Sequence, residues 1–309
     1  TFRAYTFYFD WNKTMKTAIT KESTHDLMFS DSVRLNGAQL TIRLLEQQGI
    51  NFIAGIPGGA NLPLYDALVD SSITHILARH EQGAGFIAQG LARVTGAAQV
   101  CFASSGPGAT NLVTAVADAH MDSVPLIAIT GQVDQSMIGT DAFQEADTFG
   151  LMLPITKHNF FVRSAEELSD VIAEAFRIAT SGRPGPVAID IPKDVQRQKL
   201  SISTLPCGVK SQSTPIPDPQ DIKKLLQLLN VCKRPLLMIG GGAVHSGCHR
   251  ELLQLAETQE IPVVCSFMGL GVIPSRHPLH LGMLGMHGTR AANYLLEECD
   301  LLIAARSTI

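Results

Sequence analysis

The chain has 309 residues, of which 45% are hydrophobic and 17% are charged, a composition typical of a globular protein with about two domains of ~150 residues each. A formal net charge of −4 with interspersed signs provides no basic surface for a phosphate backbone, so we expect no nucleic-acid partner. The longest uncharged stretch, from Val94 to Ala117, contains several glycines and a proline, whereas a membrane-spanning helix needs ~20 mostly apolar residues without such breaks. We therefore expect no membrane segment.

The cysteines and histidines follow no disulfide or metal pattern. The six cysteines are far apart and include no C-x-x-C pair, which favours reduced thiols and a cytoplasmic location. His245 and His249 have H-x-x-x-H spacing, but the turn around them is glycine-rich and the glutamate of a zinc-protease motif is missing. We predict no metal ligand in this chain.

The order of the elements divides the chain into four parts. Residues 1–34 mix acids with bases and contain no long apolar segment, so we expect a disordered leader there. Residues 35–198 and 220–309 each alternate strand and helix patterns, which is typical of α/β domains. The polar, proline-rich stretch at 199–219 predicts an exposed linker between them.

The first domain begins with a helix capped by Asn36 and ending at Gly49. Its later apolar runs predict parallel strands that are buried on both faces. In its last helix, Ser164 and Glu167 have the spacing of a capping box, and the apolar residues that follow recur at helical spacing. The expected strands are residues 51–56, 73–77, 99–103, 125–130 and 186–191, and the apolar helix positions are Leu168, Ile172, Ala175, Phe176 and Ala179.

The sequence pattern of the second domain predicts an incomplete Rossmann-like α/β unit. Its pattern ends after about three strands, too few for an ordinary α/β layer. We therefore expect the chain to be truncated at its carboxyl end. The expected elements are helices at 225–229 and 252–259 and strands at 235–240, 261–264 and 300–305.

Glu81 is the first candidate for chemistry. It follows a predicted strand at the start of a helix with small and apolar neighbours, so we expect a carboxyl group with few polar partners and little hydration. The helix dipole alone also favours a glutamate in a first turn, so this residue by itself does not establish a site.

The ordered motifs around Glu81 resemble the pyrimidine-binding domain of thiamine diphosphate enzymes. Within that superfamily, the later motifs are similar to the large catalytic subunit of acetohydroxyacid (acetolactate) synthases, and the resemblance extends from about Leu35 to Leu302. The motifs are GIPGGANLPLYDAL from Gly55, RHEQGAG from Arg79, SSGPGATN from Ser104, TGQV from Thr130, IGTDAFQE from Ile138, TKHN from Thr156 and SGRPGPVAIDIPKDV from Ser181.

The resemblance implies how the aminopyrimidine ring of the cofactor would be held. Glu81 would bond to N1′ of that ring and thereby promote removal of the thiazolium C2 proton. Pro57, Gly58 and Gly59 would form a turn against the same ring, where glycines allow close backbone approach.

Three further residues match positions that face the substrate in the resembled family, namely Phe143, Gln144 and Lys193. A lysine and an amide beside a 2-ketoacid can hold its carboxylate and a developing oxyanion. Taken alone, each would be an ordinary loop residue. The SSGPGATN turn is interpreted as structural, because the diphosphate binds elsewhere in this family.

The resemblance also implies a structural FAD that performs no net redox step. The glycine cluster after the strand at 235–240 does not have the G-x-G-x-x-G spacing of a dinucleotide site, so the FAD assignment depends on the resemblance alone. The implied contacts are Arg183, Gly240, Gly241, Gly242, Phe267, Met268, Leu284, Gly285, Met286, His287 and Gly288.

The function implied is decarboxylation of pyruvate and its ligation to a second pyruvate or to 2-ketobutyrate, the first common step of valine, leucine and isoleucine biosynthesis. Mg²⁺ is implied as well, but the G-D-G…N motif that would hold it is missing from this chain. We expect a homodimer of catalytic subunits, with or without a small regulatory subunit, and expect this chain alone to be inactive. The alternatives are another thiamine diphosphate enzyme, such as pyruvate oxidase, and a non-catalytic remnant.

Overall fold

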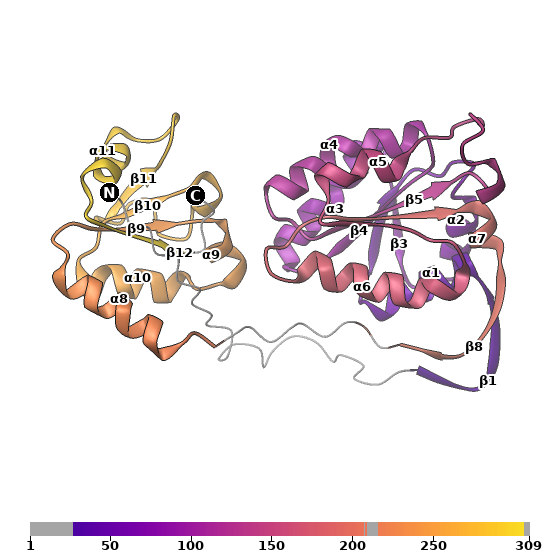
Figure 1. The fold of residues 1–309 in the computed structure, drawn as a ribbon, viewed down its shortest axis with the longest axis horizontal. Coiled ribbons are helices and arrows are strands. Elements are labelled where there is room, and N and C mark those ends of the chain that lie inside the picture. Colours follow the sequence, from indigo (N-terminus) through magenta and orange to yellow (C-terminus); the bar gives the residue numbers. More distant parts are fainter. Residues whose placement is uncertain (1–26, 207, 209–215, 306–309) are drawn as a thin grey trace. The chain divides into compact units, whose positions relative to one another are not determined.

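The computed structural model describes residues 27–206, 208 and 216–305, and these residues form two compact units. One unit contains the described residues up to 208, and the other contains residues 216–305 (Figure 1). Each unit is an α/β structure with parallel strands, as the sequence predicts. The leader predicted over residues 1–26 lies outside the described residues.

The first unit is built on a six-stranded parallel sheet with the strand order β3-β2-β4-β5-β7-β6. β5 and β7 are fully buried, which explains why most of their residues are apolar. The predicted strands are all present within a residue or two of their expected ends, but β6 was missed. The strands are β2 (Phe52–Gly55), β3 (Thr74–Leu77), β4 (Gln99–Ala103), β5 (Leu126–Gln132), β6 (His158–Phe161) and β7 (Val187–Pro192).

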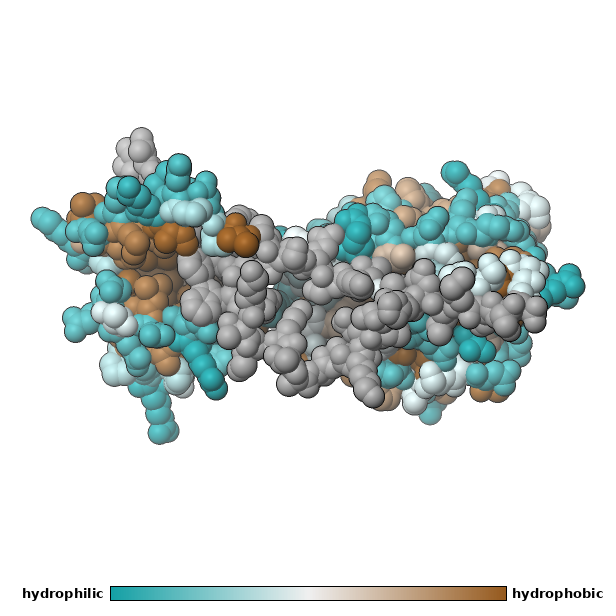
Figure 2. Space-filling model, turned by 90° about the horizontal axis from the view of Figure 1, so that it is seen from below, coloured by the Kyte–Doolittle hydropathy of each residue, from teal (hydrophilic) through white to brown (hydrophobic). Residues whose placement is uncertain are grey.

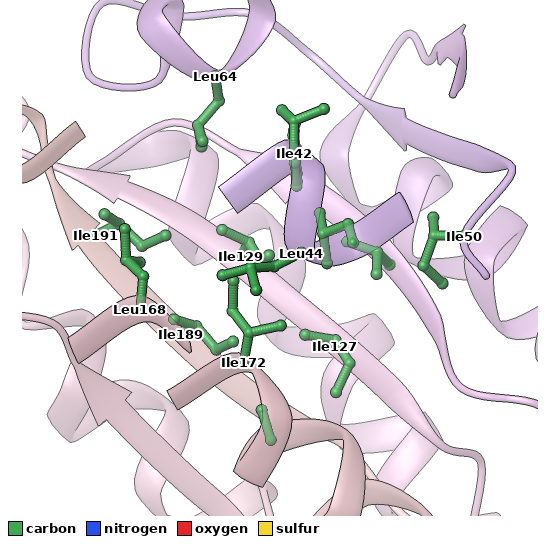
Figure 3. Close-up of a cluster of buried hydrophobic side chains, with 14 of the residues drawn as sticks. Ile42, Leu44, Ile50, Leu64, Ile127, Ile129, Leu168, Ile172, Ile189 and Ile191 are labelled. Carbon is green, nitrogen blue, oxygen red and sulfur yellow. The ribbon is translucent and has the colours of Figure 1, made fainter. Parts of the chain in front are cut away.

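Helices cover both faces of this sheet (Figure 1). One face packs on α1 (Gly37–Gln47) and α6 (Leu168–Thr180), and the other on α3 (Glu81–Thr95), α4 (Pro107–Met121) and α5 (Thr148–Met152). Figure 3 shows the first interface, in which side chains of α1 and α6 meet the isoleucines of β5 and β7. The short helices α2 (Leu62–Val69) and α7 (Lys193–Arg197) complete the unit.

The two predicted helix starts have different outcomes. Asn36 caps α1 as expected, because its Oδ1 accepts from the Gln39 amide at 2.8 Å while the Gln39 side chain accepts from the Asn36 amide. The capping box predicted between Ser164 and Glu167 is wrong, because the Glu167 carboxylate instead accepts from the Arg163 amide at 3.0 Å. The apolar positions predicted for α6 are all buried.

The expected leader and linker are wrong where they overlap the described residues. β1 (Leu27–Asn36) and β8 (Lys199–Leu205) pair as an antiparallel two-stranded ribbon. Residues 27–34 of the expected leader and 199–205 of the expected linker therefore form regular structure. Neither strand is a continuous apolar run, and paired residues of the two strands are more than 160 positions apart in the sequence. The local sequence pattern therefore gave no signal for this pairing.

The second unit has a parallel sheet of four strands in the order β11-β10-β9-β12, rather than the three strands expected. The strand β11 (His280–Met283), and the helices α9 (Gly241–Ser246) and α11 (Arg290–Glu298), were missed. The other elements are α8 (Pro219–Val231), β9 (Pro235–Ile239), α10 (His249–Gln259), β10 (Val263–Cys265) and β12 (Leu301–Ala305).

The surface of the second unit retains apolar groups. Figure 2 shows apolar residues gathered among hydrophilic ones on one side of this unit. The helix α8 contributes to its surface, because no residue of α8 is fully buried. No helix in the described parts of the chain combines the length and apolarity needed to cross a bilayer.

Candidate cofactor-binding site

The predicted catalytic segments lie at one edge of the six-stranded sheet. After β2 the chain continues to β3 on one side, whereas β4 pairs with β2 on its other side, so the strand order reverses at β2. In α/β sheets, ligands bind beyond the carboxyl ends of the strands at such a reversal. The turn at 57–59 follows β2, Glu81 follows β3, and Ser104 follows β4, so all three border this position.

The turn at 57–59 is held closely against the segment that follows β4. A Cβ atom at Gly58 would lie 2.5 Å from the Cβ atom of Ser104, so only glycine fits there. The Gly58 amide donates to Asn61 Oδ1 at 2.7 Å, and the Ala60 amide donates to Ser104 Oγ at 3.3 Å. Gly59, by contrast, has open space around its Cβ position.

Glu81 is the first residue of α3, and its carboxylate is half-buried. Asn111 Nδ2, from the first turns of α4, donates to Glu81 Oε2 at 2.9 Å. The other oxygen, Oε1, accepts no hydrogen bond from the described residues and lies 3.4 Å from the position that a Cβ atom of Gly108 would occupy. The sequence predicts a carboxyl group with few polar partners, and among the described residues Asn111 is the hydrogen-bond partner of this side chain.

Gly108 connects Glu81 with the glycine turn. A Cβ atom at Gly108 would lie 3.3 Å from Ser104 Cβ as well as near Glu81 Oε1, and Ser104 also contacts Gly58. The carboxylate, the SSGPGATN segment and the glycine turn are thus successive neighbours. A side chain at Gly58 would therefore project toward Ser104 and narrow the space between the glycine turn and the SSGPGATN segment.

The loop that carries Phe143 and Gln144 packs on the same segment. A Cβ atom at Gly106, whose φ is +57°, would lie 2.6 Å from the carbonyl oxygen of Gln144. Gln144 itself has a φ of +61°, and Phe143 is 88% exposed. The structure therefore places the backbone of Gln144 next to the Glu81 region and directs the Phe143 ring into solvent within this unit.

Lys193 begins α7, directly after β7, and is half-buried. Among the described residues, its ammonium group has no hydrogen-bond or ion-pair partner. The neighbouring Asp194 carboxylate accepts from the Gln135 amide at 3.2 Å and from Gln135 Nε2 at 3.1 Å. The loop after β5 is therefore anchored beside Lys193 at its start and beside Gly106 near its end.

Sequence reasoning missed Asn111 and Tyr65 as neighbours of the site. Burial chiefly raises the pKa of the Tyr65 hydroxyl, and Cys101 and Glu81 raise it further. The Tyr65 hydroxyl is buried without a hydrogen-bond partner among the described residues. The only sequence signal for Asn111 was its membership of the SSGPGATN motif, which does not indicate that its side chain would meet Glu81.

The segments expected to contact FAD lie together in the second unit. Gly240 precedes α9, Gly241 and Gly242 begin it, and Phe267 and Met268 follow β10, where a Cβ atom at Gly241 would lie 2.8 Å from Met268 Cβ. The loop of residues 284–288 follows β11 and is joined to β10 by the Leu284 amide, which donates to the Cys265 carbonyl at 2.9 Å. These three segments thus share the carboxyl edge of neighbouring parallel strands.

Arg183 lies apart from the Glu81 region. Its Nε donates to Ser123 Oγ at 2.6 Å, and its Nη2 donates to the Met121 carbonyl at 2.8 Å. Because Met121 ends α4 whereas Asn111 lies near its start, Arg183 occupies the opposite edge of the first unit. The exposed guanidinium stabilises the carboxyl end of α4.

The comparison with known proteins matches both units to one family. Residues 35–151 match the family model described as thiamine pyrophosphate enzyme, N-terminal TPP binding domain, and residues 222–306 match thiamine pyrophosphate enzyme, central domain. The chain therefore belongs to the thiamine pyrophosphate enzymes, and its first unit is a cofactor-binding domain of that family.

Within this family the chain is similar to large subunits of acetolactate synthase. It is 57% identical over 271 residues to acetolactate synthase isozyme 1 large subunit of Escherichia coli (strain K12), covering 87% of this chain and 48% of the relative. It is 52% identical over 275 residues to the probable acetolactate synthase large subunit of Methanocaldococcus jannaschii, covering 87% and 46%. The corresponding values for the Corynebacterium glutamicum large subunit are 50% over 279 residues, 89% and 44%. The chain spans about half the length of the curated relatives it matches, and the resemblance found in the motifs is confirmed.

Proposed function

We propose that this chain supplies the pyrimidine-binding half of the active site of an acetolactate synthase. The complete protein would decarboxylate pyruvate and join the product to a second pyruvate or to 2-ketobutyrate, in branched-chain amino acid biosynthesis. The observation that carries this proposal is the half-buried Glu81 side chain beside a glycine turn at the strand reversal, where Asn111 binds Oε2 and no described residue binds Oε1.

The residues present fit the aminopyrimidine of thiamine diphosphate. Gly58 and Gly108 leave room where a side chain would otherwise project, and Glu81 Oε1 has no other partner among the described residues. When bound, the cofactor supplies a thiazolium carbon that becomes nucleophilic once its proton is removed. Glu81 would hold a proton at N1′ of the aminopyrimidine, and Asn111 would fix the orientation of its carboxyl group.

We assign the substrate side to Gln144, Lys193 and Phe143. The ammonium of Lys193, which has no partner among the described residues, can attract the carboxylate of a 2-ketoacid, and the amide of Gln144 can donate to its carbonyl oxygen. Phe143 would exclude water from the reacting carbon once its exposed ring is covered. The support is that Gln144 is fixed against Gly106, and Asp194, beside Lys193, binds the start of the same loop.

We further propose that FAD contacts the second unit through the segments at 240–242, 267–268 and 284–288; Arg183, in the first unit, stays a prediction from the resemblance. The FAD proposal is supported by the position of these segments at the carboxyl edge of parallel strands, where Phe267 and Met286 are exposed. The described residues gather no cluster of three or more groups suited to a metal ion, so no residue of this chain is assigned to Mg²⁺.

A homodimer forms part of the same proposal. The helix α3 begins at Glu81 and presents Gly83, Phe86, Gly90 and Val94 at helical spacing on its solvent side. Phe86 is 40% exposed and Val94 is 88% exposed. A second catalytic subunit covering this apolar face would also approach Glu81 at the start of the helix, and a small regulatory subunit could join this assembly. The five described cysteines are free, which supports the cytoplasmic location expected from the sequence.

The test is acetolactate formation from pyruvate by the complete protein that contains this chain, with thiamine diphosphate, Mg²⁺ and FAD present. We expect turnover in the parent protein and a loss of about 10²–10⁴-fold in kcat for Glu81→Gln, which cannot exchange a proton. The matched control is Glu297→Gln, since Glu297 is exposed on α11 in the other unit. Turnover of pyruvate to other products, or full activity of Glu81→Gln, would reject the proposal.

A further inference from the structure

The first unit contains a buried carboxyl group for which the proposed reaction has no use. Asp190 lies in the middle of β7 and is only 3% exposed. No cation pairs with it among the described residues. Instead, Thr130 Oγ1 donates to Asp190 Oδ1 at 2.7 Å, and Gln132 Nε2 donates to Asp190 Oδ2 at 3.0 Å.

These three side chains meet because of the strand register. β5 and β7 are parallel neighbours in which Thr130 lies directly opposite Asp190. Side chains two positions apart on a strand share a face, so Gln132 lies on the same face as Thr130. That face is the one that packs on α5, so the network lies between the sheet and the chain segment leading to α5.

Gln132 extends this network out of the sheet. Its Nε2 also donates to the Ala146 carbonyl at 3.0 Å, and its Oε1 accepts from the Val133 amide at 2.9 Å. Residues 133 and 146 are the first and nearly the last residues of the loop that carries Phe143 and Gln144. One amide side chain therefore binds both ends of this loop, and Asp190 fixes the orientation of that amide.

The loop also has its own internal bonds. The Glu145 carboxylate accepts from the amides of Gly139 and Ala142, and these bonds lower the pKa of Glu145. These contacts define the shape of the loop tip, but they do not connect it to the sheet. The connection near its carboxyl end is the bond from Gln132 to Ala146.

We propose that Asp190 is a positioning residue, which acts through Gln132 to hold the loop of residues 133–147, and with it Phe143 and Gln144, against the turn at Gly106. The inference depends on the proposed function for the roles of Phe143 and Gln144, but the bonding network itself does not. A neutral amide can replace the carboxyl group, because Asn at position 190 can accept from Gln132 and donate to the Thr130 hydroxyl.

The test is amide hydrogen exchange of the 309-residue chain, followed by mass spectrometry of peptides from residues 133–147. The peptides of α1 and α6 serve as internal references for global stability. This readout requires no cofactor and no turnover, so a negative result would refute the positioning role of Asp190 and leave the proposed function untouched. A negative result in the activity assay described above would refute the proposed function and leave the positioning role untouched.

Each variant removes a different hydrogen bond of the network. Gln132→Met, which is close in shape, removes the tether, which is the bond from Gln132 to the Ala146 carbonyl, and Asp190→Ala removes the carboxyl group that orients Gln132. We expect exchange about tenfold faster in residues 133–147 for both, with α1 and α6 unchanged. Thr130→Val removes the other bond to Asp190 but keeps the tether, so its loop should exchange within about twofold of the parent rate.

Asp190→Asn is the conservative replacement, and we expect it to retain parent-like protection of the loop. If Asp190→Ala does not fold, then Gln132→Met and Asp190→Asn still decide the question. Parent-like exchange in Gln132→Met would overturn the proposal. So would equal loosening of the loop in Thr130→Val, or loosening of α1 and α6 to the same extent as the loop.

Discussion

The side-chain amide of Asn111 donates to Glu81 Oε2 at 2.9 Å, which joins the second turn of α4 to the first turn of α3. The bond fixes the plane of the carboxyl group and leaves Glu81 Oε1 facing Gly108, in the first turn of α4. A carboxyl group that must contact one nitrogen of a planar ring benefits from such fixation, because a free rotor loses entropy on binding.

This relationship predicts the behaviour of Asn111 variants. In the complete enzyme, Asn111→Leu retains a similar shape but leaves Glu81 free to rotate, so we expect kcat to fall by about 10–100-fold. The KM for pyruvate should change little, because Asn111 contacts Glu81 and not the substrate side. Steady-state kinetics with pyruvate would measure both parameters, and an unchanged kcat would show that the bond does not orient Glu81.

A second prediction concerns the glycine turn. Gly58→Ala places a Cβ atom 2.5 Å from Ser104 Cβ, so we expect the free energy of unfolding to fall by about 1–3 kcal/mol. Gly59→Ala is the matched control, because nothing lies within 4 Å of its Cβ position. Urea unfolding of the chain should show this difference, and equal stability of the two variants would contradict the close packing of Gly58 on Ser104.

A third prediction concerns Gly106 and Gly139. Both have positive φ, at +57° and +80°, but only a Cβ atom at Gly106 would meet neighbouring backbone, at Gln144. We expect Gly139→Ala to cost about 1–2 kcal/mol from backbone strain alone, and Gly106→Ala to cost measurably more. Equilibrium denaturation tests this order. The reverse order would mean that the loop does not rest on Gly106.

A fourth prediction follows from Asp190. Burial raises its pKa from the ordinary value of 3.8 to about 7, although the bonds from Thr130 and Gln132 partly oppose this, and Asp147 adds to it. The unfolded chain ionises at the ordinary value, whereas the folded chain keeps the proton until about pH 7. The free energy of unfolding contributed by this group therefore falls as pH rises through this window, by up to about 4 kcal/mol, and is constant above it.

Denaturation at a series of pH values would measure that dependence. Asp190→Asn should flatten the slope between about pH 4 and 7, since an amide does not ionise there. Asp170→Asn, at an exposed position on α6, should keep the slope of the parent chain. A parent-like slope in Asp190→Asn would show that Asp190 is ionised throughout this range.

The parts of the fold that sequence could predict are those determined by local pattern. The strands β2, β4, β5 and β7 are apolar runs bounded by turn residues, and the cap at Asn36 needs only residues three positions apart. The ribbon of β1 and β8 could not be predicted, because it depends on a pairing between distant segments without a continuous apolar run.

The site divides in a similar way. The positions of Glu81 and the glycine turn after neighbouring strands followed from the motifs and the expected parallel sheet. The partner of Glu81 could not be predicted, because it depends on how α3 packs against α4. Asp190 stands in an apolar strand pattern, and only the register that places it opposite Thr130 explains how a carboxyl group is accommodated there.

The measurement that tests the central claim most directly is the exchange rate of the thiazolium C2 proton of thiamine diphosphate bound to the complete enzyme, followed by proton NMR after dilution into D₂O. If Glu81 holds a proton at the aminopyrimidine, Glu81→Gln should slow this exchange by about 10²–10³-fold, while Glu297→Gln leaves it unchanged. An exchange rate in Glu81→Gln equal to that of the parent enzyme would contradict the role assigned to Glu81.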